Sequence, residues 1–146
     1  MARVKILIVL IGFLIFVSPS EAQILENAEE AFQLSAETQK PVLLIFSGSD
    51  WCAPCIRFQR TVLSDNQFLH YAADHFILLK ADFPQRKKLT SKMVQQNEAL
   101  AEKYNPKGQF PHIVLLHPDK SVLSTLFYKN QASQEFISQL SSHFAE

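Results

Sequence analysis

Cysteine, glycine and an excess of charge are all scarce in this 146-residue sequence. It has 2 cysteines, 3 glycines, and 14 basic against 14 acidic side chains, which gives a formal net charge of +0 at pH 7. A chain without excess positive charge gives no reason to expect a nucleic acid or an anionic membrane surface as its partner. A tetrahedral metal site needs more ligands than one cysteine pair supplies, so no metal cofactor is expected.

Apolar side chains, in contrast, are plentiful. They make up 47% of the residues against 19% charged, and 12 of them are phenylalanines. A chain of this length holds one ordinary domain and is too short for two. The composition therefore predicts a single folded domain with a well-filled core rather than a disordered tail.

The start of the chain differs in character from the rest. Two basic residues precede an apolar run over residues 6–17, and the small residues Ser20 and Ala22 follow it. This is the layout of a secretory signal peptide that is cut before Gln23.

An uncleaved membrane anchor is the alternative for this segment. The apolar run has 12 residues, whereas a helix that spans a bilayer needs about 20. We therefore expect a signal peptide over residues 1–22 and a mature domain over residues 23–146, located in the periplasm.

Export would place Cys52 and Cys55 in an oxidising compartment. There a dithiol either forms a disulfide or is kept reduced by a dedicated donor. A disulfide between residues three positions apart closes a very small loop and restrains little of the unfolded chain. The spacing therefore favours redox use of the pair, with an inert bridge and a pair of metal ligands as the alternatives.

Hydrophobic patterning predicts an α/β domain. Residues 42–46 form a continuous apolar run of strand length, which is typical of a strand buried on both faces. The last two strands should form a hairpin, and Asp65 or Asn66 and Ser133 are the expected caps of two helices. The expected order is helix 26–38, strand 42–46, helix 52–63, helix 66–74, strand 76–82, helix 90–104, strand 112–117, strand 122–128 and helix 133–144.

The two cysteines follow strand 42–46 and a short loop, at the start of the next helix. A helix N-terminus carries unpaired N–H groups and the positive end of the helix dipole, which stabilise a thiolate. We therefore expect the pKa of Cys52 to lie below the free value of about 8.5, and Cys52 to act as the nucleophile. Cys55 lies one turn further along, where it can attack a mixed disulfide on Cys52 and release the substrate. Pro54 falls in the first turn, where its missing N–H costs nothing.

With this motif in place, the sequence resembles the thioredoxin superfamily. The matching residues are Trp-Cys-Ala-Pro-Cys at 51–55, the strand before them, and Phe110-Pro111 before the strand 112–117. The resemblance covers residues 26–144. It implies a thioredoxin-like α/β fold, a central mixed four-stranded sheet flanked by helices, with an extra N-terminal helix. It also implies that Pro111 is a cis-proline beside the dithiol.

The resemblance is incomplete at positions that serve proton transfer and helix shape in the family. Thioredoxins carry a buried Asp six residues before the first cysteine, where this chain has Phe46, and a Lys in the next strand, where it has Leu78. Lys80, two residues further on, is a weak substitute. The proline that kinks the active-site helix is replaced by Arg60. These differences leave open which group takes the proton of the second cysteine.

The resemblance implies an exported thiol–disulfide oxidoreductase whose dithiol needs no metal or organic cofactor. Residues 47–52 and 80–84 look like exported thioredoxin-like proteins of Bacteroides-type bacteria. Trp51, Phe110 and Pro111 would bind the substrate, although core packing is an alternative role for Trp51. The Ala-Pro pair between the cysteines favours a reductase over an oxidase.

The expected partners follow from the same reaction. They are cysteine-containing exported proteins and a membrane thiol–disulfide electron donor or acceptor, with no nucleic acid, and the chain itself is expected to be a monomer. The alternative function is a binding module of the same fold whose dithiol is idle.

Several polar residues near the motif have two interpretations. His112 either tunes the thiolate or is simply a polar residue at a strand start, and Asp50 is a minor candidate for a proton carrier. Arg57 either adds positive potential near Cys52 or lies on a solvated helix face. The basic segment 86–88 either attracts an acidic partner or is a solvated loop. In both cases the sequence favours the solvated surface.

Overall fold

The computed structural model describes residues 20–144 of the chain. The expected signal peptide therefore lies almost wholly outside the described residues. Within residues 20–144, no helix combines the length and the apolar character that crossing a membrane requires. The elements in chain order are β1 (Ile24–Leu25), α1 (Ala28–Thr38), β2 (Val42–Ser47), α2 (Ala53–Phe58), a π-helical turn (Gln59–Leu63), α3 (Asn66–His75), β3 (Ile77–Asp82), α4 (Ser91–Tyr104), β4 (His112–Leu116), β5 (Val122–Leu126) and α5 (Ser133–Ser141).

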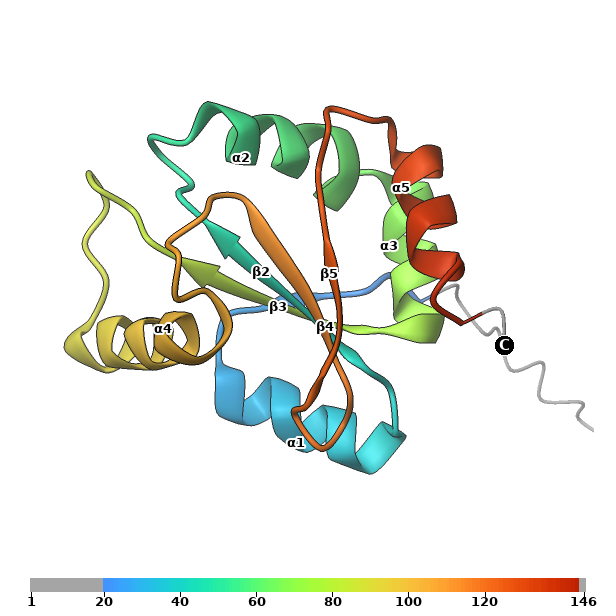
Figure 1. Ribbon diagram of the computed structural model, residues 1–146, viewed down its shortest axis with the longest axis horizontal. Coiled ribbons are helices and arrows are strands. Elements are labelled where there is room, and N and C mark those ends of the chain that lie inside the picture. Colours follow the sequence, from blue (N-terminus) through green and yellow to red (C-terminus); the bar gives the residue numbers. More distant parts are fainter. Residues whose placement is uncertain (1–19, 145–146) are drawn as a thin grey trace, which may run out of the picture.

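The sheet has five strands in the order β1-β3-β2-β4-β5, of which Figure 1 labels β2 to β5. Strand β2 pairs in parallel with β3 and antiparallel with β4, and β4 and β5 form the expected hairpin. The prediction of a mixed sheet is confirmed, but the prediction of four strands is wrong. The additional strand, β1, pairs in parallel with β3 through only two residues, which is too short a segment to show a strand pattern in the sequence.

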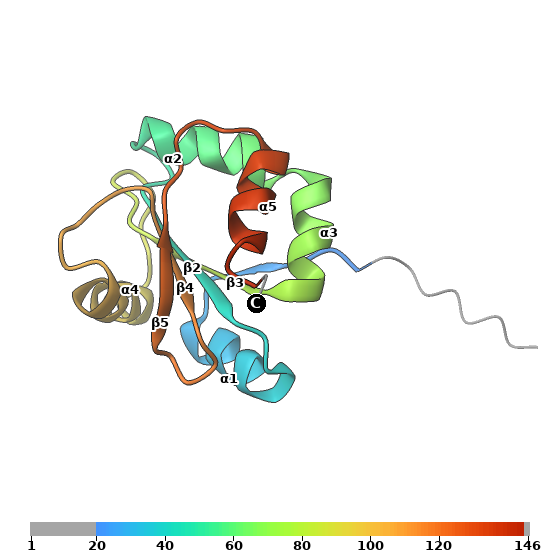
Figure 2. The same cartoon turned by 45° about the vertical axis from the view of Figure 1, so that its right-hand side comes forward.

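Helices cover both faces of the sheet (Figure 2). Leu43 and Ile45 pack towards α2, α3 and α5, in a core with Phe58, Phe68 and Phe136. The alternate residues of β2 pack on the other face, towards α1 and α4. All six residues of β2 are buried, so the prediction of a strand buried on both faces is confirmed.

Most helix starts have a side-chain cap. Asn27 accepts hydrogen bonds from two backbone N–H groups of α1, so this helix begins two residues later than expected. Asp65 caps α3 by accepting from Phe68 N, as predicted. The prediction that Ser133 caps α5 is wrong, because Ala132 holds the cap position. The Ser133 hydroxyl instead donates to Asp65 Oδ1 at 2.8 Å and thereby ties α5 to α3.

Candidate active site

Cys52 and Cys55 form a disulfide at the start of α2. The loop from β2 is closed by the Cys52 backbone N–H, which donates to the Gly48 carbonyl oxygen at 2.9 Å. Cys52 then takes the N-cap position, and its Sγ accepts from the Cys55 N–H at 3.3 Å. The dithiol therefore lies at the helix N-terminus, where the chain's own N–H groups stabilise negative charge on sulfur once the pair is reduced.

The two sulfurs have different surroundings. Both cysteines are buried, Cys52 at 6% exposure and Cys55 at 2%. The Sγ of Cys55 accepts from the Gly48 N–H at 3.5 Å. A cavity of about 100 Å³ lies beside it, lined by Ser47, Ser49, Cys55, Ile56, Gln59 and Arg60.

The active-site helix changes its winding directly after the dithiol turn. Residues Gln59–Leu63 form a π-helical turn, and Arg60, which replaces the family's proline, lies in it. A π turn is one of the few local causes of a change in helix course, and it frequently occurs at functional sites. The turn places Gln59 and Arg60 in the lining of the cavity at Cys55.

The position of the family's buried aspartate has a different role here. Phe46 is fully buried, with its ring centroid 6.4 Å from that of Phe83 and 5.9 Å from the His112 ring. Lys80, the candidate substitute for the family's lysine, forms an ion pair with Glu26 at 3.7 Å. Phe46 and Lys80 therefore do not replace the proton-accepting carboxylate that the family's aspartate provides for the second cysteine.

Two aromatic residues and a proline gather at the same end of the sheet as the dithiol. The Trp51 indole is 40% exposed and meets the Phe110 ring edge-on, with the centroids 5.5 Å apart. The Phe110–Pro111 peptide bond is cis. Because His112 pairs with Phe46 near the end of β2, Pro111 lies at the edge from which the loop to the dithiol leaves. The structure thus brings Trp51 into contact with Phe110, which precedes Pro111 in the chain, and their role in substrate binding stays a prediction.

Asp50 anchors the basic loop, residues 85–88, beside this surface. Its carboxylate accepts hydrogen bonds from the backbone N–H groups of Gln85, Arg86 and Lys87 at 2.8, 2.7 and 3.0 Å. These bonds, the one from Gln85 first, lower the pKa of Asp50 below its ordinary value of 3.8. A carboxylate engaged in this way is a structural anchor, so the structure gives no support to Asp50 as a proton carrier.

Two other residues near the motif have specific contacts. The Nε2 of His112 lies 3.1 Å from the Tyr104 carbonyl oxygen, and loss of hydration lowers the pKa of His112 from its ordinary value of 6.5. Arg57 donates to the Asn130 Oδ1 at 3.1 Å. The contact of His112 agrees with its interpretation as a polar residue at a strand start, and Arg57 is exposed, which agrees with a solvated helix face.

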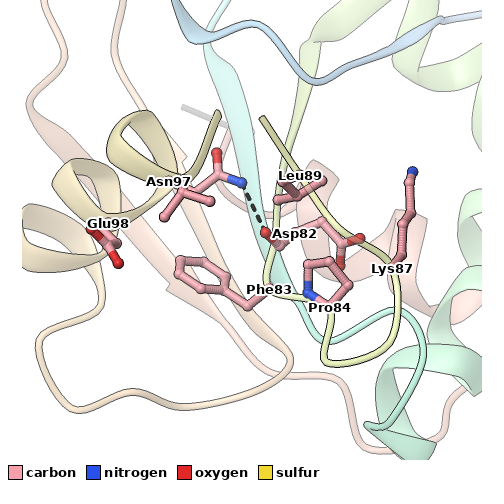
Figure 3. A pocket seen from close by; sticks show the side chains of 8 residues that line it. Asp82, Phe83, Pro84, Lys87, Leu89, Asn97 and Glu98 are labelled. Carbon is pink, nitrogen blue, oxygen red and sulfur yellow. Dashed lines mark hydrogen bonds between the residues drawn. The ribbon is translucent and has the colours of Figure 1, made fainter. Parts of the chain in front are cut away.

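Asp82 is the site residue that sequence reasoning missed. It ends β3 opposite Ser47 and is only 6% exposed. It also lines a pocket of about 180 Å³ (Figure 3). Among residues 20–144, no three His, Cys, Asp or Glu side chains lie close enough together to hold a metal ion. The position of Asp82 at the carboxyl end of the central parallel strand β3 is the signal that could have found it, because ligands and catalytic groups gather at that edge of an α/β sheet.

A thioredoxin-like family model matches residues 23–118. The chain belongs to the thioredoxin-like family. It is 31% identical over 117 residues to the disulfide bond reductase DsbH of Chlamydia pneumoniae, covering 80% of this chain and 70% of that protein. It is 32% identical over 95 residues to the thioredoxin-related protein DsbJ of the same organism, covering 64% of this chain but only 27% of that protein.

Solved structures agree with the assignment. A DsbH oxidoreductase superposes with a TM-score of 0.78 at 28% identity and covers 85% of each chain. A thioredoxin from Thermus thermophilus gives a TM-score of 0.63 at 19% identity, covering 85% of this chain and 88% of that one, which shows the fold alone.

These relatives and the Cys52–Cys55 pair identify the protein as a thiol–disulfide oxidoreductase that acts with redox partner proteins. Both relatives come from Chlamydia pneumoniae, so the likeness to Bacteroides-type proteins stays a prediction.

Proposed function

We propose that this oxidoreductase is an exported disulfide reductase that acts on cysteine-containing exported proteins. The observation that carries the proposal is the match to a protein named disulfide bond reductase over 70% of that protein's length. The Ala-Pro pair between the cysteines supports the same direction, and the basic start, apolar run and small residues before Gln23 support export.

The reaction follows from the order of the two sulfurs. The Cys52 thiolate attacks a substrate disulfide, so that one substrate sulfur leaves as a thiolate and the other remains bound to Cys52. Cys55 then attacks the Cys52 sulfur, which releases the second substrate thiol and forms the Cys52–Cys55 disulfide. The substrate gains two electrons and the protein loses two. A membrane thiol–disulfide donor returns them by the same exchange in reverse.

The surface formed by Trp51, Phe110 and Pro111 is where the substrate would lie. An extended substrate segment would pair with the Phe110 backbone and pass over the exposed face of Trp51. This arrangement would hold one substrate sulfur near Cys52, the less buried of the two cysteines.

The reduction potential of the Cys52–Cys55 couple tests the direction. A value of about −270 mV fits a reductase, and one of about −120 mV would show an oxidant instead. The companion assay is reduction of a protein disulfide by a small thiol, with and without this protein. The Cys52→Ser variant is the control and should leave only the uncatalysed rate.

Export and oligomeric state have direct tests. N-terminal sequencing of protein recovered from the periplasm should begin at or near Gln23, whereas an intact Met1 on membrane-bound protein would contradict the proposal. Sedimentation of the mature domain should give the mass of a monomer.

A further inference from the structure

The second step of the exchange requires a base. Cys55 must lose its proton before it attacks the mixed disulfide on Cys52, because the thiolate is the nucleophile. At 2% exposure, Cys55 has little contact with bulk solvent, and water itself is a weak proton acceptor near neutral pH. A carboxylate linked to the sulfur by hydrogen-bonding groups would serve this step better.

Asp82 is a buried carboxylate next to the dithiol loop. It accepts two hydrogen bonds from Ser49, one from the backbone N–H at 3.0 Å and one from the hydroxyl at 2.5 Å. Its backbone is fixed by the Asn97 side chain, which donates to the Asp82 carbonyl oxygen at 2.8 Å (Figure 3). Neither ion pair found among residues 20–144 involves Asp82. The carboxylate is therefore held by Ser49 and not by a cation.

Ser49 connects this carboxylate to Cys55. Both Ser49 and Cys55 line the cavity of about 100 Å³ beside the active-site helix. That space is large enough for water, and the polar residues Ser47, Ser49 and Gln59 are part of its lining. The Gly48 N–H donates to the Cys55 Sγ, so the loop that carries Ser49 also holds the sulfur at the edge of the cavity.

We propose that Asp82 is the proton acceptor for Cys55, acting through a water molecule in this cavity and the Ser49 hydroxyl. The Cys55 thiol gives its proton to the water, the water passes a proton to the Ser49 Oγ, and Ser49 passes its own proton to the Asp82 Oδ2. The Cys55 thiolate then attacks the Cys52 sulfur, the bond from Cys52 to the substrate sulfur breaks, and the substrate leaves as a thiolate. The inference rests on dithiol exchange and not on its direction, since protonated Asp82 returns the proton in the reverse reaction.

Other charged groups near these residues do not take this role. Asp50 is occupied by three backbone N–H groups, and Arg60, which lines the same cavity, has no site that accepts a proton. Lys87 and Glu98 line the other pocket at Asp82, whose lining does not include Cys55. The His112 ring packs against Phe46 and is not among the residues that line the cavity at Cys55.

The test separates the two thiols by mixing reduced protein with excess 5,5′-dithiobis(2-nitrobenzoate) and following thiolate release. The first phase is attack by Cys52 and depends on reagent concentration. The second phase is attack by Cys55 on the mixed disulfide, and its rate does not depend on reagent concentration. Asp82→Asn should slow the second phase by about tenfold or more at pH 6.5 and leave the first unchanged. Its second-phase rate should then rise in proportion to hydroxide concentration up to pH 8.

Ser49 and Glu98 supply the matched variants. Ser49→Ala should slow the second phase as Asp82→Asn does, and Ser49→Thr, which keeps a hydroxyl, should restore it. Glu98→Gln removes an exposed carboxylate from the far side of the pocket and should change neither phase.

Two results would overturn the proposal. One is an unchanged second phase in both Asp82→Asn and Ser49→Ala, which would make bulk solvent the acceptor. The other is slowing of both phases together, which would give Asp82 a purely structural role in the loop. If Asp82→Asn fails to fold, the Ser49 variants decide. Failure of the oxidoreductase assignment would look different, because wild-type protein would then lack the first phase.

Discussion

The indole Nε1 of Trp51 donates a hydrogen bond of 2.7 Å to the main-chain carbonyl oxygen of Phe83. This bond joins the loop that carries the dithiol to the loop after β3, 32 residues later in the chain. The same ring meets Phe110 edge-on and lies directly against Gly48. Trp51 is therefore held in one orientation with part of its face exposed, as a preformed docking surface requires.

Gly48→Ala should displace Trp51. A Cβ at position 48 would lie 2.6 Å from the indole Cζ2 and Nε1 atoms, closer than side chains pack, so the ring must move away. We expect a loss of about 1–3 kcal/mol in the free energy of unfolding, the usual cost of overpacking. Because Trp51 is the only tryptophan, its fluorescence reports the displacement directly.

The exposed Leu34 on α1 provides the comparison for this variant. Leu34→Ala should leave the Trp51 emission spectrum as in the wild type. Native-like emission from Gly48→Ala, with unchanged stability, would show that the ring does not depend on this close contact.

Asp50→Ala should release the basic loop. The variant removes the acceptor of three backbone N–H groups, those of Gln85, Arg86 and Lys87. Hydrogen exchange at these amides should become roughly tenfold faster, because each loses a hydrogen bond to a charged group. Asp50→Asn keeps an acceptor oxygen and should give an intermediate rate. Equal exchange in all three proteins would contradict the anchoring role.

The sequence predicted those elements whose signal is local. The apolar run of β2 shows a buried strand because its neighbours on both faces are also apolar. Asp65 was found as a cap because its acceptor role lies three residues away, at Phe68. The dithiol and Phe110-Pro111 were found because their residue types are specific to one chemistry.

What the sequence could not show depends on partners far along the chain. Asp82 and Ser49 are 33 positions apart, and nothing in either segment alone indicates the hydrogen bond. Ser133 looks like a cap, yet its hydroxyl donates to Asp65, 68 residues earlier. The π-helical turn also has no sequence signature, since Arg60 shows only that the family's proline is missing.

His112 should make stability depend on pH. Desolvation lowers the pKa of His112 in the folded protein below 6.5, so the unfolded chain binds a proton first as the pH falls. The stabilising contribution of neutral His112 is therefore complete above about pH 6.5 and is lost as the pH falls through the folded-state pKa. Urea unfolding between pH 8 and pH 5 should show this decline.

His112→Gln should flatten that decline. The loss of packing against Phe46 is measured separately at pH 8, where the imidazole is neutral in both states. If the variant and the wild type lose stability in parallel between pH 8 and pH 5, His112 is not the group responsible.

Cys52→Ser and Cys55→Ser should have opposite effects on capture of substrates. Cys52 is the less buried of the two cysteines and occupies the N-cap of α2, so Cys52→Ser should abolish attack on disulfides. Cys55→Ser keeps the nucleophile but removes the resolving thiol, and mixed disulfides with cysteine-containing exported proteins should accumulate on Cys52. Non-reducing electrophoresis of a periplasmic extract, followed by reduction, measures the captured proteins. The role assignment is wrong if alkylation of the reduced wild-type protein at pH 6–7 labels Cys55 before Cys52. It is also wrong if Cys55→Ser captures only those proteins that Cys52→Ser captures as well.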